Sequence, residues 1–268
     1  MFSQVNALFE NLWDNYLEVT PSAVKIHKLL GSTQGDDVSN DHIALRTFNI
    51  PKVGLNVLAA HFEALGYKAC GEYHFVAKKL YAKHYEHPGD PNLPKVFISE
   101  LLVEQCSPQL QQCVQDLVAK VAPEATRKAN FLYSGRHWDI DYGTYQMLLE
   151  ESEFAAWVAA WGYRANHFTV SNNLLANFDS IEKINAAVKN AGLSLNVSGG
   201  EIKGSKEVML EQSSTLADLH GVAFSDGARA IPSCFYEFAK RYPTADGQLF
   251  SGFVAQSADK IFESTNAR

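Results

Sequence analysis

Two histidines and one glutamate stand in stretches of the sequence whose pattern predicts strands: His42 in NDHIALRTF, His167 in RANHFTVSNN and Glu237 in CFYEF. Two imidazoles and one carboxylate bind Fe(II) or another divalent metal on one face and leave positions open for a substrate and oxygen. A carboxylate among aromatic residues is costly to bury unless it is paired or bound to a metal. We therefore predict a metal site at these three residues, with hydrogen-bonded structural histidines as the alternative.

A second carboxylate, Glu100 in FISELLV, carries the same cost of burial. Its place in the sequence matches that of Glu237, which makes it a candidate fourth ligand. It is equally an ion-pair partner for Arg46 or Arg164, and we favour the ion pair.

Arg46 shares one side of its predicted strand with His42, because side chains alternate between the two faces. The two side chains are spaced by roughly 13 Å along a strand. A small dicarboxylate fits such a gap, with one end on the metal and the other on the guanidinium through paired hydrogen bonds. The alternative is an arginine on an edge strand that faces solvent. Further along the chain, in the second of two similar units, LEQSST offers Gln212 and Ser213 to Thr215, which either position a substrate or form a turn.

The elements that position these residues form a repeat. Residues 39–105 and 164–243 each have the order strand with His, helix ending at Gly, strands, and a strand with Glu. Two such βαβββ modules, with their sheets paired, predict an α+β fold with a cupped sheet. We expect one domain, with a helical N-terminal segment 1–38, a helical connector 106–163 and a C-terminal segment 244–268.

Composition excludes several classes of protein. The 268 residues are 46% hydrophobic and 20% charged, and the formal net charge is −7, which argues against a general affinity for nucleic acid. The apolar runs are too short to cross a bilayer, and the N-terminus predicts an amphipathic helix and no export signal. The cysteines lack CxxC spacing, so we expect them reduced and mostly buried in a cytoplasmic protein, without a zinc cluster: Cys70, Cys106, Cys113 and Cys234.

Several segments together resemble the DUF1338 family, the 2-oxoadipate dioxygenase/decarboxylase family. They are NDHIALRTF, FISELLVE, RANHFTV, LEQSSTLAD, CFYEFAKRY and GFVAQSADKIFEST, and they span nearly the whole chain. The resemblance implies a fold like that of the vicinal oxygen chelate superfamily, in agreement with the paired modules.

The resemblance also implies the site and its chemistry. A non-haem Fe(II) falls on His42, His167 and Glu237, although another divalent metal can occupy the isolated protein. Substrate contacts fall on both histidines, on Arg46, which is also the expected catalytic residue, and on Val254. The implied reaction takes a 2-oxo acid and O2, releases CO2 and leaves a shortened 2-hydroxy acid; 2-oxoadipate would give 2-hydroxyglutarate, a step suited to lysine degradation.

Two other functions compete with this one. In a lyase or isomerase of the same superfamily, Glu100 is a fourth ligand around zinc or nickel and no oxygen is used. A non-catalytic binding module would keep the cupped sheet and lose the chemistry. Members of the family are longer than this chain, and few residues follow Glu237, so we expect a substrate-covering segment to be missing. The sequence does not determine an oligomeric state.

Overall fold

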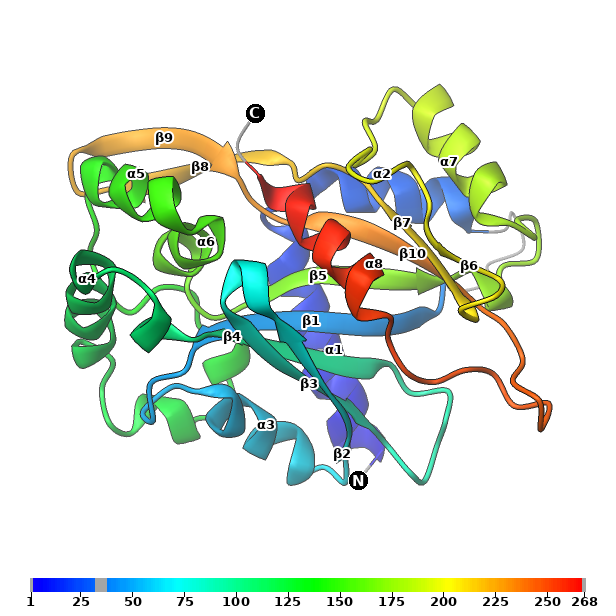
Figure 1. Ribbon diagram of the computed structural model, residues 1–268, viewed down its shortest axis with the longest axis horizontal. Helices are drawn as coiled ribbons and strands as arrows, with labels where there is room; N and C mark the ends of the chain where they lie inside the picture. Colours follow the sequence, from blue (N-terminus) through cyan, green and yellow to red (C-terminus); the bar gives the residue numbers. More distant parts are fainter. Residues whose placement is uncertain (1, 32–37, 267–268) are drawn as a thin grey trace.

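The computed structural model describes residues 2–31 and 38–266, and its main element is a curled sheet with helices on both faces (Figure 1). The sheet has eight strands in the order β2-β3-β4-β1-β5-β10-β7-β6. Their bounds are Asn40–Phe48 (β1), Lys68–Phe75 (β2), Leu80–Glu86 (β3), Lys95–Leu101 (β4), Ala165–Ser171 (β5), Lys203–Ser205 (β6), Leu210–Ser214 (β7) and Phe235–Arg241 (β10).

The predicted α+β fold of paired modules is confirmed. The first module runs β1, α3 (Leu55–Glu63), β2, β3 and β4, and the second runs β5, α7 (Ile181–Asn190), β6, β7 and β10. The opening strands of the two modules, β1 and β5, pair antiparallel at the middle of the sheet. This pairing places the strands that carry the two histidines next to each other. The exact domain and segment boundaries stay a prediction.

One element was not predicted. A hairpin of β8 (Leu219–Phe224) and β9 (Gly227–Pro232) stands between β7 and β10 and forms a separate sheet. It packs against the helical connector, where the Phe224 ring lies 5.3 Å from that of Tyr142. Ser225 and Asp226 form the turn between its strands, and the sequence Asp226–Gly227, in which Gly227 opens β9, is a typical hairpin signal. The last strand predicted from Ile231 therefore begins instead at Phe235.

The connector is mainly helical, as predicted, with α4 (Pro108–Ala119), α5 (Tyr142–Glu151) and α6 (Glu153–Trp161). Side-chain caps begin all three of these helices: Ser107 accepts from Leu110 N, Asp141 from Thr144 N and Ser152 from Ala155 N. From Phe154 to Trp161, α6 is buried on all sides. A helix that is apolar all round belongs inside a protein, and here it packs at one end of β1.

The two faces of the sheet have different partners. In Figure 1, α1 (Phe2–Leu17) lies behind the sheet, while α8 (Ala255–Ile261) lies in front of it. Trp13 and Tyr16 of α1 pack on Phe168, with ring centroids 4.9 and 5.0 Å away. Because Phe168 directly follows His167 in β5, the two side chains point to opposite faces. The histidine therefore faces α8. Helix α2 (Pro21–Leu30) packs beside α1.

Glu100 lies on the face away from the histidines, so its predicted roles are wrong. In the parallel pairing of β4 with β1 it stands opposite Thr47, whose side chain points away from that of Arg46. Its carboxylate accepts a hydrogen bond of 2.7 Å from Leu55 N at the start of α3. Anions are favoured at a helix N-terminus, where backbone N–H groups lack partners. Glu100 is thus neither a fourth ligand nor the ion-pair partner of Arg46 or Arg164.

The true counterpart of Glu237 in the first module is Phe97. Glu237 pairs with Thr169, two residues after the histidine of its module, and Phe97 pairs with Ala44, two residues after the other histidine. Glu100 is three residues further along β4, and an odd offset moves a side chain to the other face. The repeat is therefore real in the order of its elements, but the position in the first module that corresponds to Glu237 carries a phenyl ring.

None of the helices in the described ranges is long and apolar enough to span a membrane. The cysteines, all within those ranges, form no disulfide. Cys106 and Cys234 are buried and Cys113 is half-buried, but Cys70 is exposed, which differs from the prediction for this residue.

We expect the connector's last turn to tolerate no side chain at Gly162. Its φ is +67°, and an added Cβ would lie 2.2 Å from Gly135 O. Gly192 has φ +79° with nothing within 4 Å of an added Cβ, so it is the matched control. Gly192→Ala should lower the free energy of unfolding by about 1 kcal/mol from strain alone. Gly162→Ala adds a backbone clash and should cost more than about 4 kcal/mol. Urea unfolding measures both, and equal losses would contradict the packing at Gly162.

Candidate metal centre

His42, His167 and Glu237 converge on one point of the buried sheet face. They come from β1, β5 and β10, three neighbouring strands, and one ligand atom from each lies within 4.8 Å of the other two. Glu237 Oε1 is 3.6 Å from His42 Nε2, and Oε2 is 3.1 Å from His167 Nε2. The predicted meeting of the three side chains is therefore what the structure contains, and we call them the triad.

Each histidine of the triad is oriented by the residue before it. His42 Nδ1 is 2.7 Å from Asp41 Oδ1, and His167 Nδ1 is 3.1 Å from Asn166 Oδ1. Because these oxygens only accept, each ring donates through Nδ1–H, and its Nε2 keeps a lone pair directed at Glu237. Sequence reasoning missed both partners. The signal was an Asp or Asn directly before each candidate histidine.

Asp41 reaches its histidine because it is the extra residue of a β-bulge. Between Asn40 and His42 the register with β5 shifts by one residue. A bulge re-aims the side chain that it carries. The Asp41 carboxylate also binds Arg241, whose Nε and Nη2 lie 2.7 and 2.9 Å from its oxygens. Arg241 thus neutralises the carboxylate that orients the ring.

The donor set of the triad fits a metal ion. Gln212 Nε2 donates to Glu237 Oε1 at 2.6 Å, but Glu237 Oε2 receives no hydrogen bond although it is buried. Two imidazole lone pairs and this carboxylate are all acceptors that face one another, which requires a proton or a cation between them. The Thr169 hydroxyl, 3.0 Å from His42 Nε2, supplies one weak donor. No thiolate takes part, so the set suits a metal that prefers nitrogen and oxygen ligands.

The pKa shifts of the triad also indicate that the buried Glu237 carboxylate requires a positive charge beside it. Burial alone would raise the pKa of Glu237, but the two imidazoles lower it to about 2. Burial would lower the pKa of His42, but the carboxylates of Glu237 and Asp41 raise it above 6.5. For His167 burial prevails, and its pKa falls below 6.5. Without a metal, a proton on His42 therefore balances Glu237.

The cavity in front of the triad is small because the C-terminal segment covers it. Its volume is about 20 Å³. Besides the triad and Gln212, its lining comes from β4, from the loop before α8 and from the chain's last helices: Phe97, Phe253, Ala258, Ile261 and Phe262. The C-terminal segment of this chain therefore provides a cover, and the expectation that an additional covering segment is missing stays a prediction. Val254, which precedes α8, does not line this cavity, and its predicted contact with substrate stays a prediction.

Arg46 is on the predicted face but is held next to the cavity. It is 1% exposed, and Nη1 donates to Glu153 Oε1 at 3.0 Å while Nη2 donates to Thr265 Oγ1 at 3.0 Å. Its Nε is buried without a partner. Three rings lie 5.0 to 5.5 Å from the guanidinium, those of Phe154, Trp157 and Phe262. Glu153, which the sequence reasoning did not single out, thus takes the role that had been given to Glu100.

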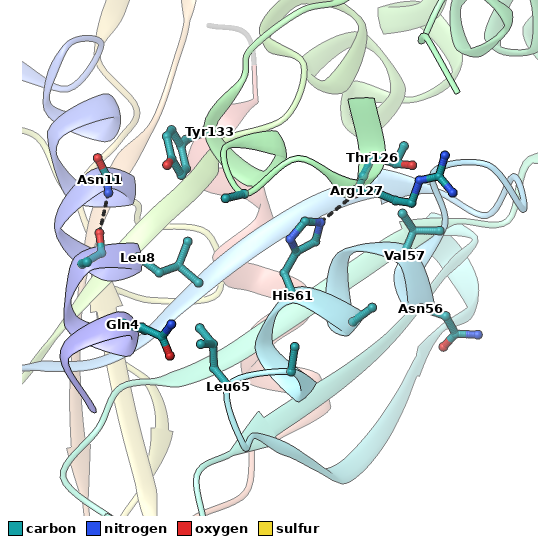
Figure 2. Close-up of a pocket in the computed structure, with 14 residues that line it drawn as sticks. Gln4, Leu8, Asn11, Asn56, Val57, His61, Leu65, Thr126, Arg127 and Tyr133 are labelled. Carbon is teal, nitrogen blue, oxygen red and sulfur yellow. Dashed lines mark hydrogen bonds between the residues drawn. The ribbon is translucent and has the colours of Figure 1, made fainter. Parts of the chain in front are cut away.

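A much larger hollow lies away from this chemistry. Figure 2 shows it between α1, α3 and residues 126–133, with a volume of about 820 Å³. His61 is its one histidine and is hydrogen-bonded to Thr126 O at 2.8 Å. No carboxylate stands among its described lining residues. Since α1 lies behind the sheet, this hollow is on the opposite side from the triad, and size alone would misplace the site.

Comparison with known proteins gives the class and then the family. The fold matches a glyoxalase-superfamily protein from Ralstonia eutropha with a TM-score of 0.78 at 22% identity, covering 94% of this chain and 86% of that one. The model of the 2-oxoadipate dioxygenase/decarboxylase family matches residues 1–248. A rice protein of that name is 35% identical over 284 residues, which are 97% of this chain and 78% of the relative.

Two solved structures also match this chain over most of its length. Rice hydroxyglutarate synthase in complex with 2-oxoadipate has a TM-score of 0.91 and 36% identity, with 99% of this chain and 92% of that chain covered. A Shewanella frigidimarina protein named as a hydrolase has a TM-score of 0.90 and 63% identity, with 94% and 98% covered.

Fold and triad together define a protein with the fold of that glyoxalase-superfamily structure and with a candidate metal centre. Within that class, the chain belongs to the 2-oxoadipate dioxygenase/decarboxylase family, which is a family of enzymes.

We expect Glu237→Gln to weaken binding of Mn(II), a metal that prefers nitrogen and oxygen ligands, at least about 100-fold, because it removes a ligand and its charge. Glu100→Gln is the matched control, since that carboxylate is on the other face, and its affinity should stay within about twofold. Electron paramagnetic resonance of free Mn(II) measures both. Equal affinities in the two variants would exclude the triad as the site.

Metal affinity should fall as the pH is lowered. The pKa of His42 lies above 6.5, so below that pKa a metal must displace a proton from this ring. The dissociation constant for Mn(II) should then rise about tenfold per pH unit on the acid side. The same titration between neutral and mildly acidic pH measures the slope, and a flat profile would show that His42 is not a ligand.

Proposed function

We propose that this protein is an Fe(II)-dependent 2-oxoadipate dioxygenase/decarboxylase. One 2-oxoadipate and one O2 would give one 2-hydroxyglutarate and one CO2, which balances all atoms. The observation that supports this most is the buried triad of two histidines and one carboxylate in a chain of this family. The iron would supply oxygen activation and chelation of the 2-oxo acid.

The side chains of the protein would hold the iron, orient its carboxylate ligand and exclude water. The Nε2 atoms of His42 and His167 and the carboxylate of Glu237 occupy one side of the metal position. Gln212 holds the carboxylate through Oε1 and leaves Oε2 free. Phe97 and Phe253 line the other side and exclude water, which favours oxidation of the bound substrate over side reactions.

Arg46 is proposed to bind the carboxylate of the substrate that is remote from the metal. It shares a face with His42, and its Nε has no acceptor. A buried guanidinium needs an anion, and Glu153 supplies one while no substrate is bound. A cavity of about 20 Å³ holds one or two waters. We therefore infer that the cover, residues 253–265, moves outward to admit the substrate and to open a path between the metal position and Arg46.

The competing functions lose support. A lyase or isomerase with Glu100 as fourth ligand does not fit, because Glu100 caps α3 on the far face. A binding module without chemistry has no use for an orphaned buried carboxylate oxygen. Cytoplasmic localisation and a role in lysine degradation stay predictions; both curated plant relatives are named chloroplastic.

Anaerobic loading with Fe(II), followed by oxygen-electrode assays with 2-oxoadipate, tests the function. We expect O2 consumption, CO2 and 2-hydroxyglutarate in equal amounts, all lost in Glu237→Gln. Oxygen uptake without 2-hydroxyglutarate, or turnover without oxygen, would overturn the assignment.

Arg46→Lys keeps the charge but loses the paired hydrogen bonds of the guanidinium. We expect kcat/KM for 2-oxoadipate to fall about 100-fold, or about 2.7 kcal/mol. Activity toward 2-oxohexanoate, which lacks the remote carboxylate, should change less than about threefold. Arg127→Lys, at the opposite face, is the control. An equal loss of kcat/KM for both substrates would show that Arg46 supports the fold and does not bind the remote carboxylate of the substrate.

A further inference from the structure

A second group of metal-binding side chains lies on the β2–β3 hairpin. Cys70, His84 and Glu86 each offer one ligand atom, and these atoms lie within 4.8 Å of one another. None of the three belongs to the triad. A thiol, an imidazole and a carboxylate together form the donor set of a zinc site with an open fourth position.

Local backbone features bring these side chains together. The register of β2 with β3 shifts between Ala69 and Gly71, so Cys70 is the extra residue of a β-bulge. A bulge re-aims its side chain and is over-represented near functional sites. The next residue, Gly71, leaves room for the imidazole: an added Cβ would lie 2.8 Å from His84 Nδ1. The hairpin thus has two irregularities, and both serve the position of His84 beside Cys70.

Both ring nitrogens of His84 have polar partners that orient the ring, as is common for a histidine that binds a metal. Its Nδ1 is 2.8 Å from the hydroxyl of Tyr73, and that hydroxyl accepts from Phe253 N at 3.1 Å. Nε2 lies 2.9 Å from Glu86 Oε1. Ligating histidines are commonly oriented in this way through their other ring nitrogen. Phe253, whose backbone N–H donates to the Tyr73 hydroxyl, is also part of the cover over the triad.

Space and charge both suit a divalent cation. A hollow of about 410 Å³ has Cys70 and Glu86 in its wall and leaves room for a water or another ligand. Burial and the Glu86 carboxylate raise the pKa of the Cys70 thiol, so a metal would displace its proton. A divalent ion, a thiolate and a carboxylate sum to zero charge. Lys95, which lines the same hollow, then meets no net repulsion.

We propose that Cys70, His84 and Glu86 form a second, thiophilic metal site that takes zinc or a similar soft divalent ion and is separate from the triad. Zinc bonds of about 2.0 to 2.3 Å bring ligand atoms to roughly 3.5 Å from one another. Cys70 is exposed, so rotation of its side chain closes the remaining distance. The alternative is a plain hydrogen-bonded pair of His84 and Glu86 in which the cysteine has no part.

Titration with Co(II) under reducing, anaerobic conditions distinguishes these two. A thiolate ligand gives cobalt an intense near-ultraviolet charge-transfer absorption, and the triad contains no thiolate. We expect the wild-type protein to show this absorption and to lose it when Zn(II) is added. Cys70→Ser should remove the absorption and one equivalent of bound metal. Cys113→Ser, at a half-buried cysteine of α4, should keep both.

The same titration of Glu237→Gln separates this site from the triad. The absorption should persist there, since none of its ligands is changed. An absence of the absorption in the wild-type protein, or its survival in Cys70→Ser, would overturn the second site and leave the proposed function untouched. Circular dichroism of each variant checks that the fold is retained.

Discussion

Antiparallel pairing of β1 with β5 at the centre of the sheet is the constraint on which the rest of the structure depends. It sets His42 opposite Thr169 and Ala44 opposite His167, so the two imidazoles lie diagonally across neighbouring strands. β10 then adds in parallel to β5 and places Glu237 beside Thr169. A slip of one residue in either pairing would turn a ligand to the opposite face, against the aromatic residues that pack on α1.

Burial of charge follows from this arrangement and is balanced group by group. Glu237 is fully buried against two imidazoles, Asp41 against Arg241, and Arg46 against Glu153. An uncompensated ion in such surroundings costs several kcal/mol, so each of these buried charges requires its partner. The exception is Glu237 Oε2, which is buried without a hydrogen bond and has the lone pair of His167 Nε2 3.1 Å away, so a bound cation would compensate both.

The cover is tied to the same charges. Arg241, which neutralises Asp41, also donates through Nη1 to Phe250 O and Gly252 O, just before the cover begins at Phe253. Arg46 holds Thr265 at the other end. The two buried arginines therefore connect the ends of the cover to the residues behind and beside the metal position.

The sequence by itself determined the order of the elements, the α+β class and the three residues of the candidate metal site, because strand alternation, helical periodicity and ligand chemistry are local properties. Resemblance to a family added the expected reaction. The sequence did not determine the partner of Arg46, the position of Glu100 or the bulge at Asp41. Those depend on register: which residue of β4 stands opposite β1, and which residue of α6 approaches Arg46, result from packing between segments far apart in the chain. Glu100 and Phe97 differ by three positions in one strand, and only the pairing of that strand decided which of them faces the metal position.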